Sequence, residues 1–100
     1  MKNDTLLRGR RTPSRAPYWT PLESVLPRED CTGYMWMGEI LLENGLHIHA
    51  YKHCDTRRYL HIGEDSSSWL YDPAGYAPAD IPPTEQLAAD LRELQAPPVV

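Results

Sequence analysis

The stretch YMWMGEILLENGLHIHAYKHCDTRRYLHI, residues 34 to 62, decides the fold. Its first part mixes aromatic, branched and apolar residues as strands do, and a second such run follows Asn44-Gly45. A three-residue loop over 43–45, with Gly45 in the left-handed conformation, keeps the apolar side chains of both strands on one face, whereas a two-residue turn divides them. The predicted pairs are Leu42 with Leu46, Ile40 with Ile48, and Gly38 with Ala50.

The same rule applies to the next turn, around residues 54–56. The apolar residues of the strand before it share a face with Leu60 and Ile62 only if this turn has an odd number of residues. We therefore expect an odd turn, which collects polar and aromatic side chains on the opposite side of the sheet. This predicted polar face consists of Glu39, His47, His49, Tyr51, Arg57, Tyr59 and His61.

Two further elements complete the predicted fold. SSSWLYD at 66–72 is expected to be a fourth strand, with the side taken by Trp69 and Tyr71 left open. After a loop rich in proline, TEQLAADLRELQ at 84–95 places three leucines at helical spacing, with Thr84 as its cap. The sequence thus predicts an α+β fold, a four-stranded antiparallel meander with one C-terminal helix packed on its leucine and isoleucine face, and an extended N-terminal arm.

Charge and proline content set the predicted domain boundaries. Residues 1–30 are expected to form a basic, proline-rich, largely extended arm, 31–96 the small α+β domain, and 97–100 a tail. The arm is either a solvated tail or a segment that binds phosphate or an acidic partner. Its cations are Arg8, Arg10, Arg11 and Arg15.

Several classes of protein are disfavoured by the sequence. No apolar run approaches the roughly 20 residues that cross a bilayer, and the first residues lack the apolar stretch of a signal peptide. We expect no membrane association, a location in the cytoplasm of a bacterial host cell, and free thiols at Cys31 and Cys54. No cofactor is predicted.

A metal site is one interpretation of the histidines. His-x-His places two imidazoles on one side of a strand, and the possible ligand set is Glu39, His47, His49 and His61. However, no carboxylate follows His-x-His within a few residues, and no Cys-x-x-Cys motif is present. Solvated strand histidines are the simpler interpretation, and we predict no metal.

Catalysis without a metal is a second interpretation. A small ribonuclease needs a carboxylate base, an imidazole acid and a guanidinium for the phosphate. The candidates are Glu39, His49, Arg57, Tyr59 and His61. A hairpin with mixed polar residues often contains these types by chance, so the sequence favours a protein that is not an enzyme.

Docking is the third interpretation and needs no special geometry. Tyr, His and Arg are side chains that supply interface energy, and aromatic rings beside Arg can also stack on unpaired bases. The net charge of −4 and the acidic residues Glu39, Glu43 and Asp55 favour a protein partner over nucleic acid.

The run HAYKHCDTRRYLHI, followed by WLYD, resembles a segment of short uncharacterised proteins of actinobacteria and their phages. The resemblance covers about residues 36–72 and implies a small, phage-borne accessory protein with no assigned activity. It suggests that Lys52, Asp55, Arg57, Arg58 and Tyr59 act as a unit. In such a unit, Asp55 would accept hydrogen bonds from turn amides and pair with Arg57 or Arg58.

Our interpretation of the sequence is a small non-enzymatic interaction module that binds a host protein through the predicted polar face, with the arm becoming ordered on contact. The alternatives are nucleic-acid binding through arm and sheet, a metal-dependent or ribonuclease-like enzyme, and a structural component of the virion. The sequence does not specify an oligomeric state.

Overall fold

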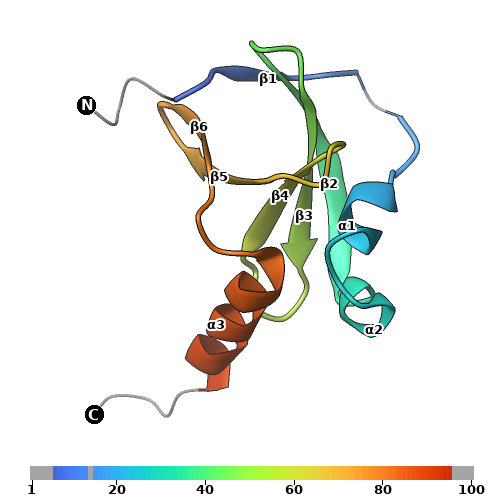
Figure 1. Ribbon diagram of the computed structural model, residues 1–100. Helices are drawn as coiled ribbons and strands as arrows, with labels where there is room; N and C mark the ends of the chain where they lie inside the picture. Colours follow the sequence, from blue (N-terminus) through green and yellow to red (C-terminus); the bar gives the residue numbers. More distant parts are fainter. Residues whose placement is uncertain (1–5, 14, 96–100) are drawn as a thin grey trace.

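The computed structural model describes residues 6–13 and 15–95, which form one antiparallel sheet of six strands and three helices (Figure 1). The strands are β1 (Gly9–Arg11), β2 (Tyr34–Leu42), β3 (His47–His53), β4 (Tyr59–Gly63), β5 (Ser68–Asp72) and β6 (Gly75–Pro78), and they lie in the sheet in chain order. The helices are α1 (Thr20–Glu23), α2 (Arg28–Cys31) and α3 (Pro83–Gln95). The predicted α+β class, antiparallel sheet and C-terminal helix are confirmed, but the prediction of four strands is wrong.

The β2–β3 hairpin has the predicted register. Ile40 pairs with Ile48 and Gly38 with Ala50, and the Leu42 amide donates to the Leu46 carbonyl at 2.9 Å. Gly45 has a φ of 93°, the left-handed conformation that a three-residue loop requires. The apolar pattern and the turn glycine therefore specify the same pairing.

The β3–β4 hairpin has the other register, so the expectation of an odd turn is wrong. Its turn contains four residues, 54–57, because the His53 amide donates to the Arg58 carbonyl at 2.9 Å and Lys52 pairs with Tyr59. The His53 side chain stabilises this turn, since its Nδ1 accepts from the amides of Asp55 at 3.1 Å and Thr56 at 3.2 Å. The even turn places Leu60 opposite Tyr51.

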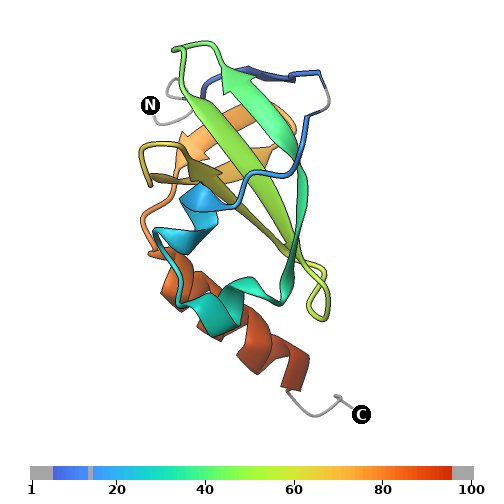
Figure 2. The same ribbon diagram turned by 90° about the vertical axis from the view of Figure 1, so that its right-hand side faces the viewer.

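One side of the sheet is covered by the helices, and we call it the helical face (Figure 2). It carries His49, Tyr51, Leu60 and Ile62, which share this side because His49 pairs with Ile62 and Tyr51 with Leu60. Leucines from α1 and α3 pack here, so α3 does not cover Ile40 and Ile48 on the other side. The buried cluster is Leu22, Leu26, Cys31, Tyr34, Tyr51, Leu60, Ile62 and Leu87.

The sheet curls into a half-barrel around its other side, which we call the concave face (Figure 1). Strands β5 and β6 turn back over β2 and β3, so that a second buried cluster forms inside the curl. This cluster is Ile40, Leu42, Ile48, Ala50, Trp69 and Tyr76. Reciprocal hydrogen bonds of 2.8 and 2.7 Å between the backbones of Leu7 and Tyr76 join the start of the described chain to β6.

The described part of the N-terminal segment contributes a strand and a buried helix to the fold. β1 pairs with β2, and Leu22 in α1 has no exposed surface. Pro21 does not prevent α1 from forming, because proline is tolerated in the first turn of a helix. The folded unit therefore includes residues on both sides of the predicted boundary at residue 30.

The helix predicted from the leucine spacing is confirmed as α3, but Thr84 is not its cap. The helix begins at Pro83, so Thr84 lies in its first turn, and Leu87 is buried while Leu94 is 52% exposed. No helix in the described part of the chain is long and apolar enough to cross a membrane.

Leu22→Ala tests whether the N-terminal segment belongs to the cooperative core. Because Leu22 is fully buried, its truncation should lower the free energy of unfolding by about 2 to 5 kcal/mol. Urea denaturation measures this change, with Leu94→Ala on the exposed side of α3 as the matched control. Equal losses for the two variants would show that α1 does not contribute to the core.

Candidate functional site

The predicted polar face is not one surface, because the β3–β4 register places its members on both sides of the sheet. The members divide into three groups: Glu39, His47, His49 and Tyr51 on the helical face, Tyr59 and His61 on the concave face, and Arg57 in the turn. The structure therefore offers two separate polar sites in place of one.

The first site is a network around Glu39 on the helical face. Glu39 is only 7% exposed, yet it accepts hydrogen bonds from His47 Nδ1 and, at 3.3 Å, from Arg15 Nη1. Burial alone would raise the pKa of Glu39, but the hydrogen bonds from His47 and Arg15 outweigh burial and lower the pKa below its ordinary value. This carboxylate is ionised and already has its partners.

His49 forms the second part of the network and is fully buried. The Trp36 indole N–H donates to Nδ1 of His49 at 3.0 Å, and Nε2 lies 2.9 Å from Oε2 of Glu64. An indole N–H can only donate, so Nδ1 carries the lone pair and Nε2 carries the proton that is donated to Glu64. The two bonds together fix one tautomer of His49.

This network contains a possible set of metal ligands, although not the predicted one. Glu39, His49 and Glu64 offer ligand atoms within 4.8 Å of one another, whereas His61 lies on the other side of the sheet. A metal at Nε2 of His49 needs a lone pair there, and the bond from Trp36 places a proton there instead. The arrangement fits a hydrogen-bonded network better than a metal centre.

The ribonuclease-like set is not assembled either. Glu39 and His49 are separated by the sheet from Tyr59 and His61, and neither Glu39 nor His49 lines the cleft to which Tyr59 and His61 contribute. A carboxylate base and an imidazole acid therefore do not face a common substrate position.

The predicted turn residues also have different partners from those expected. The Asp55 carboxylate accepts from the Cys54 thiol at 3.9 Å, and His53, not Asp55, binds the turn amides. Arg58 pairs with Glu93, which ties the turn to α3. Cys31 is buried, Cys54 is exposed, and both are free thiols.

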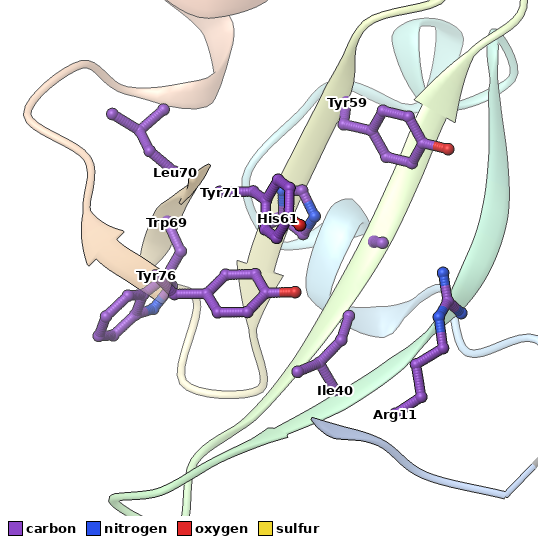
Figure 3. Close-up of a pocket in the computed structure, with 9 residues that line it drawn as sticks. Arg11, Ile40, Tyr59, His61, Trp69, Leu70, Tyr71 and Tyr76 are labelled. Carbon is purple, nitrogen blue, oxygen red and sulfur yellow. The ribbon is translucent and has the colours of Figure 1, made fainter. Parts of the chain in front are cut away.

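The second site is a cleft of about 550 Å³ on the concave face, which we call the concave cleft (Figure 3). Figure 3 shows Tyr59 and His61 on β4 and the rings of Tyr71 and Tyr76 reaching from β5 and β6, with Arg11 on the opposite side. Ile40 and Ala50 contribute apolar surface between them. Its polar and aromatic lining is Arg11, Tyr59, His61, Trp69, Tyr71 and Tyr76.

The rings of the cleft form one continuous cluster centred on His61. Its ring centroid lies 5.8 Å from that of Tyr59, nearly parallel at 13°, 6.2 Å from that of Tyr71 and 5.6 Å from that of Tyr76. Tyr59 and Tyr71 remain 42% and 59% exposed. Two large aromatic surfaces therefore face solvent at the edge of the cleft.

His61 is neutral in the physiological range. Burial lowers its pKa, and the nearby positive charge of Arg11 lowers it further, to about 4. The imidazole thus adds a ring with one donor and one acceptor to the cleft, while Arg11 supplies the charge.

Sequence reasoning named Arg11, Tyr59 and His61 of this cleft but missed Tyr76. Tyr76 lies in the segment that its prolines marked as a loop, although Pro73 and Ala74 form a two-residue turn between Asp72 and Gly75. Spacing could have found it, since Tyr71 and Tyr76 flank a four-residue run that ends in glycine. Trp69 and Tyr71, which the sequence left open, both lie on the concave face.

Comparison with protein-family models, curated proteins and solved structures finds no match to the chain. The functional argument therefore rests on the residues of the network and of the concave cleft.

The low pKa of His61 predicts a pH-dependent loss of stability. Unfolded His61 takes up its proton near pH 6.5 and folded His61 only near pH 4, so the unfolded state binds more protons between these values. Lowering the pH through this window should cost on the order of 3 kcal/mol through this one group. Denaturant titrations at several pH values should show that His61→Phe removes this component. Identical pH profiles for the two proteins would contradict the assignment.

Proposed function

We propose that this protein is a small non-enzymatic interaction module whose binding site is the concave cleft. The observation that supports this most is the exposure of Tyr71 and Tyr59, 59% and 42%, beside the apolar floor of Ile40 and Ala50. Exposed aromatic side chains at the edge of an apolar cleft are characteristic of binding sites.

Binding is better supported than catalysis by the distribution of polar groups. The residues that line the concave cleft include one imidazole and one guanidinium but no carboxylate. The histidine–carboxylate pairs lie on the helical face, and their atoms bind one another. The paired carboxylate base and imidazole acid of the ribonuclease-like hypothesis are therefore not present together in the cleft.

The biological setting is part of the proposal. From the segment at 36–72 that resembles proteins of actinobacteria and their phages, we propose a phage-borne accessory protein that acts in the cytoplasm of its host. The sequence favours a host protein as the partner because its net charge is −4 and its predicted sheet carries the acidic residues Glu39, Glu43 and Asp55. None of these three residues lines the concave cleft, so this reason does not separate a protein from a nucleic acid there. A role inside the virion would use the same surface.

Capture from an actinobacterial lysate, with and without nuclease treatment, tests the role of the cleft. Tyr71→Ala should weaken retention of the specific partner about thirtyfold, because an aromatic anchor of an interface contributes roughly 2 kcal/mol. Both the proteins and the nucleic acids that are retained are identified for each bait.

Two further baits make the result specific. Tyr71→Phe keeps the ring and should keep the partner, and Leu94→Ala removes an exposed apolar side chain from α3 and should have no effect. A partner that all four baits retain equally would place the binding surface outside the cleft and defeat the proposal.

A further inference from the structure

The shape of the concave cleft suits a flat ring. Gly38 and Ala50 pair across β2 and β3 on this side of the sheet, so the part of the floor next to Ile40 has little side-chain volume. A methyl group at Gly38 would collide with Nη1 of Arg11, which means that the guanidinium lies directly over the glycine. The small residues thus leave room beside Arg11, and the space of about 550 Å³ is within the usual size of ligand sites.

The walls of the cleft offer several ring faces. The cluster of Tyr59, His61, Tyr71 and Tyr76 continues across three strands, and Tyr59 and Tyr71 are its exposed members. Aromatic side chains stack on bases of any sequence, because every base has a π face. A series of rings along a cleft is therefore suited to successive bases of one strand.

The positive charge of Arg11 favours an anionic ligand. Arg11 donates one hydrogen bond, to the Met37 carbonyl at 3.0 Å, and no ion pair of Arg11 is found among the described residues. Among the residues 6–13 and 15–95, the carbonyl fixes the guanidinium without neutralising it and leaves its other N–H groups and its charge for a ligand. A planar guanidinium binds phosphate through two parallel hydrogen bonds.

The positive charge of the cleft does not come from Arg11 alone. Nζ of Lys52, on the concave side of β3, lies 5.7 Å from the ring centre of Tyr59. An adjoining cleft of about 540 Å³ shares Arg11, Tyr71 and Tyr76 with the concave cleft and also contains Asp72. Two cations and one carboxylate therefore lie along the row of rings.

The net charge of −4 does not oppose an anionic ligand here. None of the carboxylates of α1, α2 and α3 lines either cleft, and Glu39 and Glu64 bind histidines on the other face. Exposed charges farther away than about 8 Å are largely screened at physiological ionic strength.

We propose that the concave cleft binds a single strand of nucleic acid, with bases on the rings of Tyr59 and Tyr71 and a phosphate on Arg11. This inference names the ligand of the module and so rests on the proposed function. It selects nucleic acid over an acidic peptide because the exposed rings of Tyr59 and Tyr71 lie in the same cleft as Arg11, and bases use such rings for stacking whereas a carboxylate uses only the cation.

Fluorescence anisotropy with labelled oligodeoxyuridylate and oligouridylate of about ten nucleotides tests the proposal. Wild-type protein should bind at low salt, and log K should fall with log salt with a slope of about −1.4, as expected for two phosphate contacts on a single strand. Comparison of the two probes separates a DNA ligand from an RNA ligand, since they differ only in the 2′-hydroxyl.

Matched variants locate the contacts. Tyr71→Ala should weaken binding roughly 5- to 100-fold, the range for loss of one stacked base, and Tyr71→Phe should restore it. Arg11→Gln should weaken binding and reduce the salt slope by about 0.7, whereas Arg10→Gln on the same strand, with the same change in net charge, should not, because Arg10 points to the opposite side of β1.

The outcomes separate the inference from the proposed function. If neither oligonucleotide binds while Tyr71→Ala still loses a host protein in the capture experiment, the nucleic-acid inference is overturned and the module remains. Equal losses for Arg11→Gln and Arg10→Gln would mean nonspecific attraction and would also overturn it. If Tyr71→Ala changes neither oligonucleotide binding nor capture, both proposals fail.

Discussion

The imidazole of His53 at the end of β3 is the constraint on which the two faces of the sheet depend. Its Nδ1 accepts two turn amides and so holds residues 54–57 as a four-residue turn, in which Arg57 has a φ of 65°. A left-handed conformation costs a residue such as Arg roughly 1–2 kcal/mol, which these hydrogen bonds help to offset. Because side chains alternate along a strand, a turn one residue shorter would move Leu60 and Ile62 to the concave face and His61 to the helical face.

With this register, each face of the single sheet carries its own buried cluster. On the helical face, Tyr51, Leu60 and Ile62 are covered by α1 and α3, and the buried polar groups of Glu39 and His49 are fully paired. On the concave face, the pairing of β5 with β4 is limited to Trp69 and Ser68. Beyond Trp69, β5 pairs with β6 instead, and the rings of Tyr71 and Tyr76 line the space that opens in front of β3 and β4.

The sequence predicted those parts of the fold in which local and long-range preferences agree. At residues 43–45 the glycine and the flanking leucines both require the same loop, and three leucines specify α3. The turn at 54–57 could not be predicted in this way, because it is stabilised by the side chain of His53 at the end of β3. A histidine at this position gives the same sequence pattern whether it binds turn amides or faces water. The predicted polar face was divided by this error, since six of its seven residues lie on β3 and β4 or in the turn between them. The proline content led to a wrong prediction at the N-terminus, where Leu22 in α1 and Leu26 after it are both buried in the core.

The net charge of the chain does not predict the charge of the concave cleft, because the fold places carboxylates and Arg11 on different faces of the sheet. The carboxylates of Glu39, Glu64 and Glu93 are bound by side chains with N–H groups on the helical face or at α3. Arg11 instead rests on a neutral carbonyl over Gly38, where no side chain could replace hydrogen without displacing it. A guanidinium held by a carbonyl keeps its full charge for a ligand, so a chain with an excess of acids can still present a cationic, aromatic cleft. Glycine at position 38 therefore has two roles, since it leaves the floor open and lets the charge lie across it.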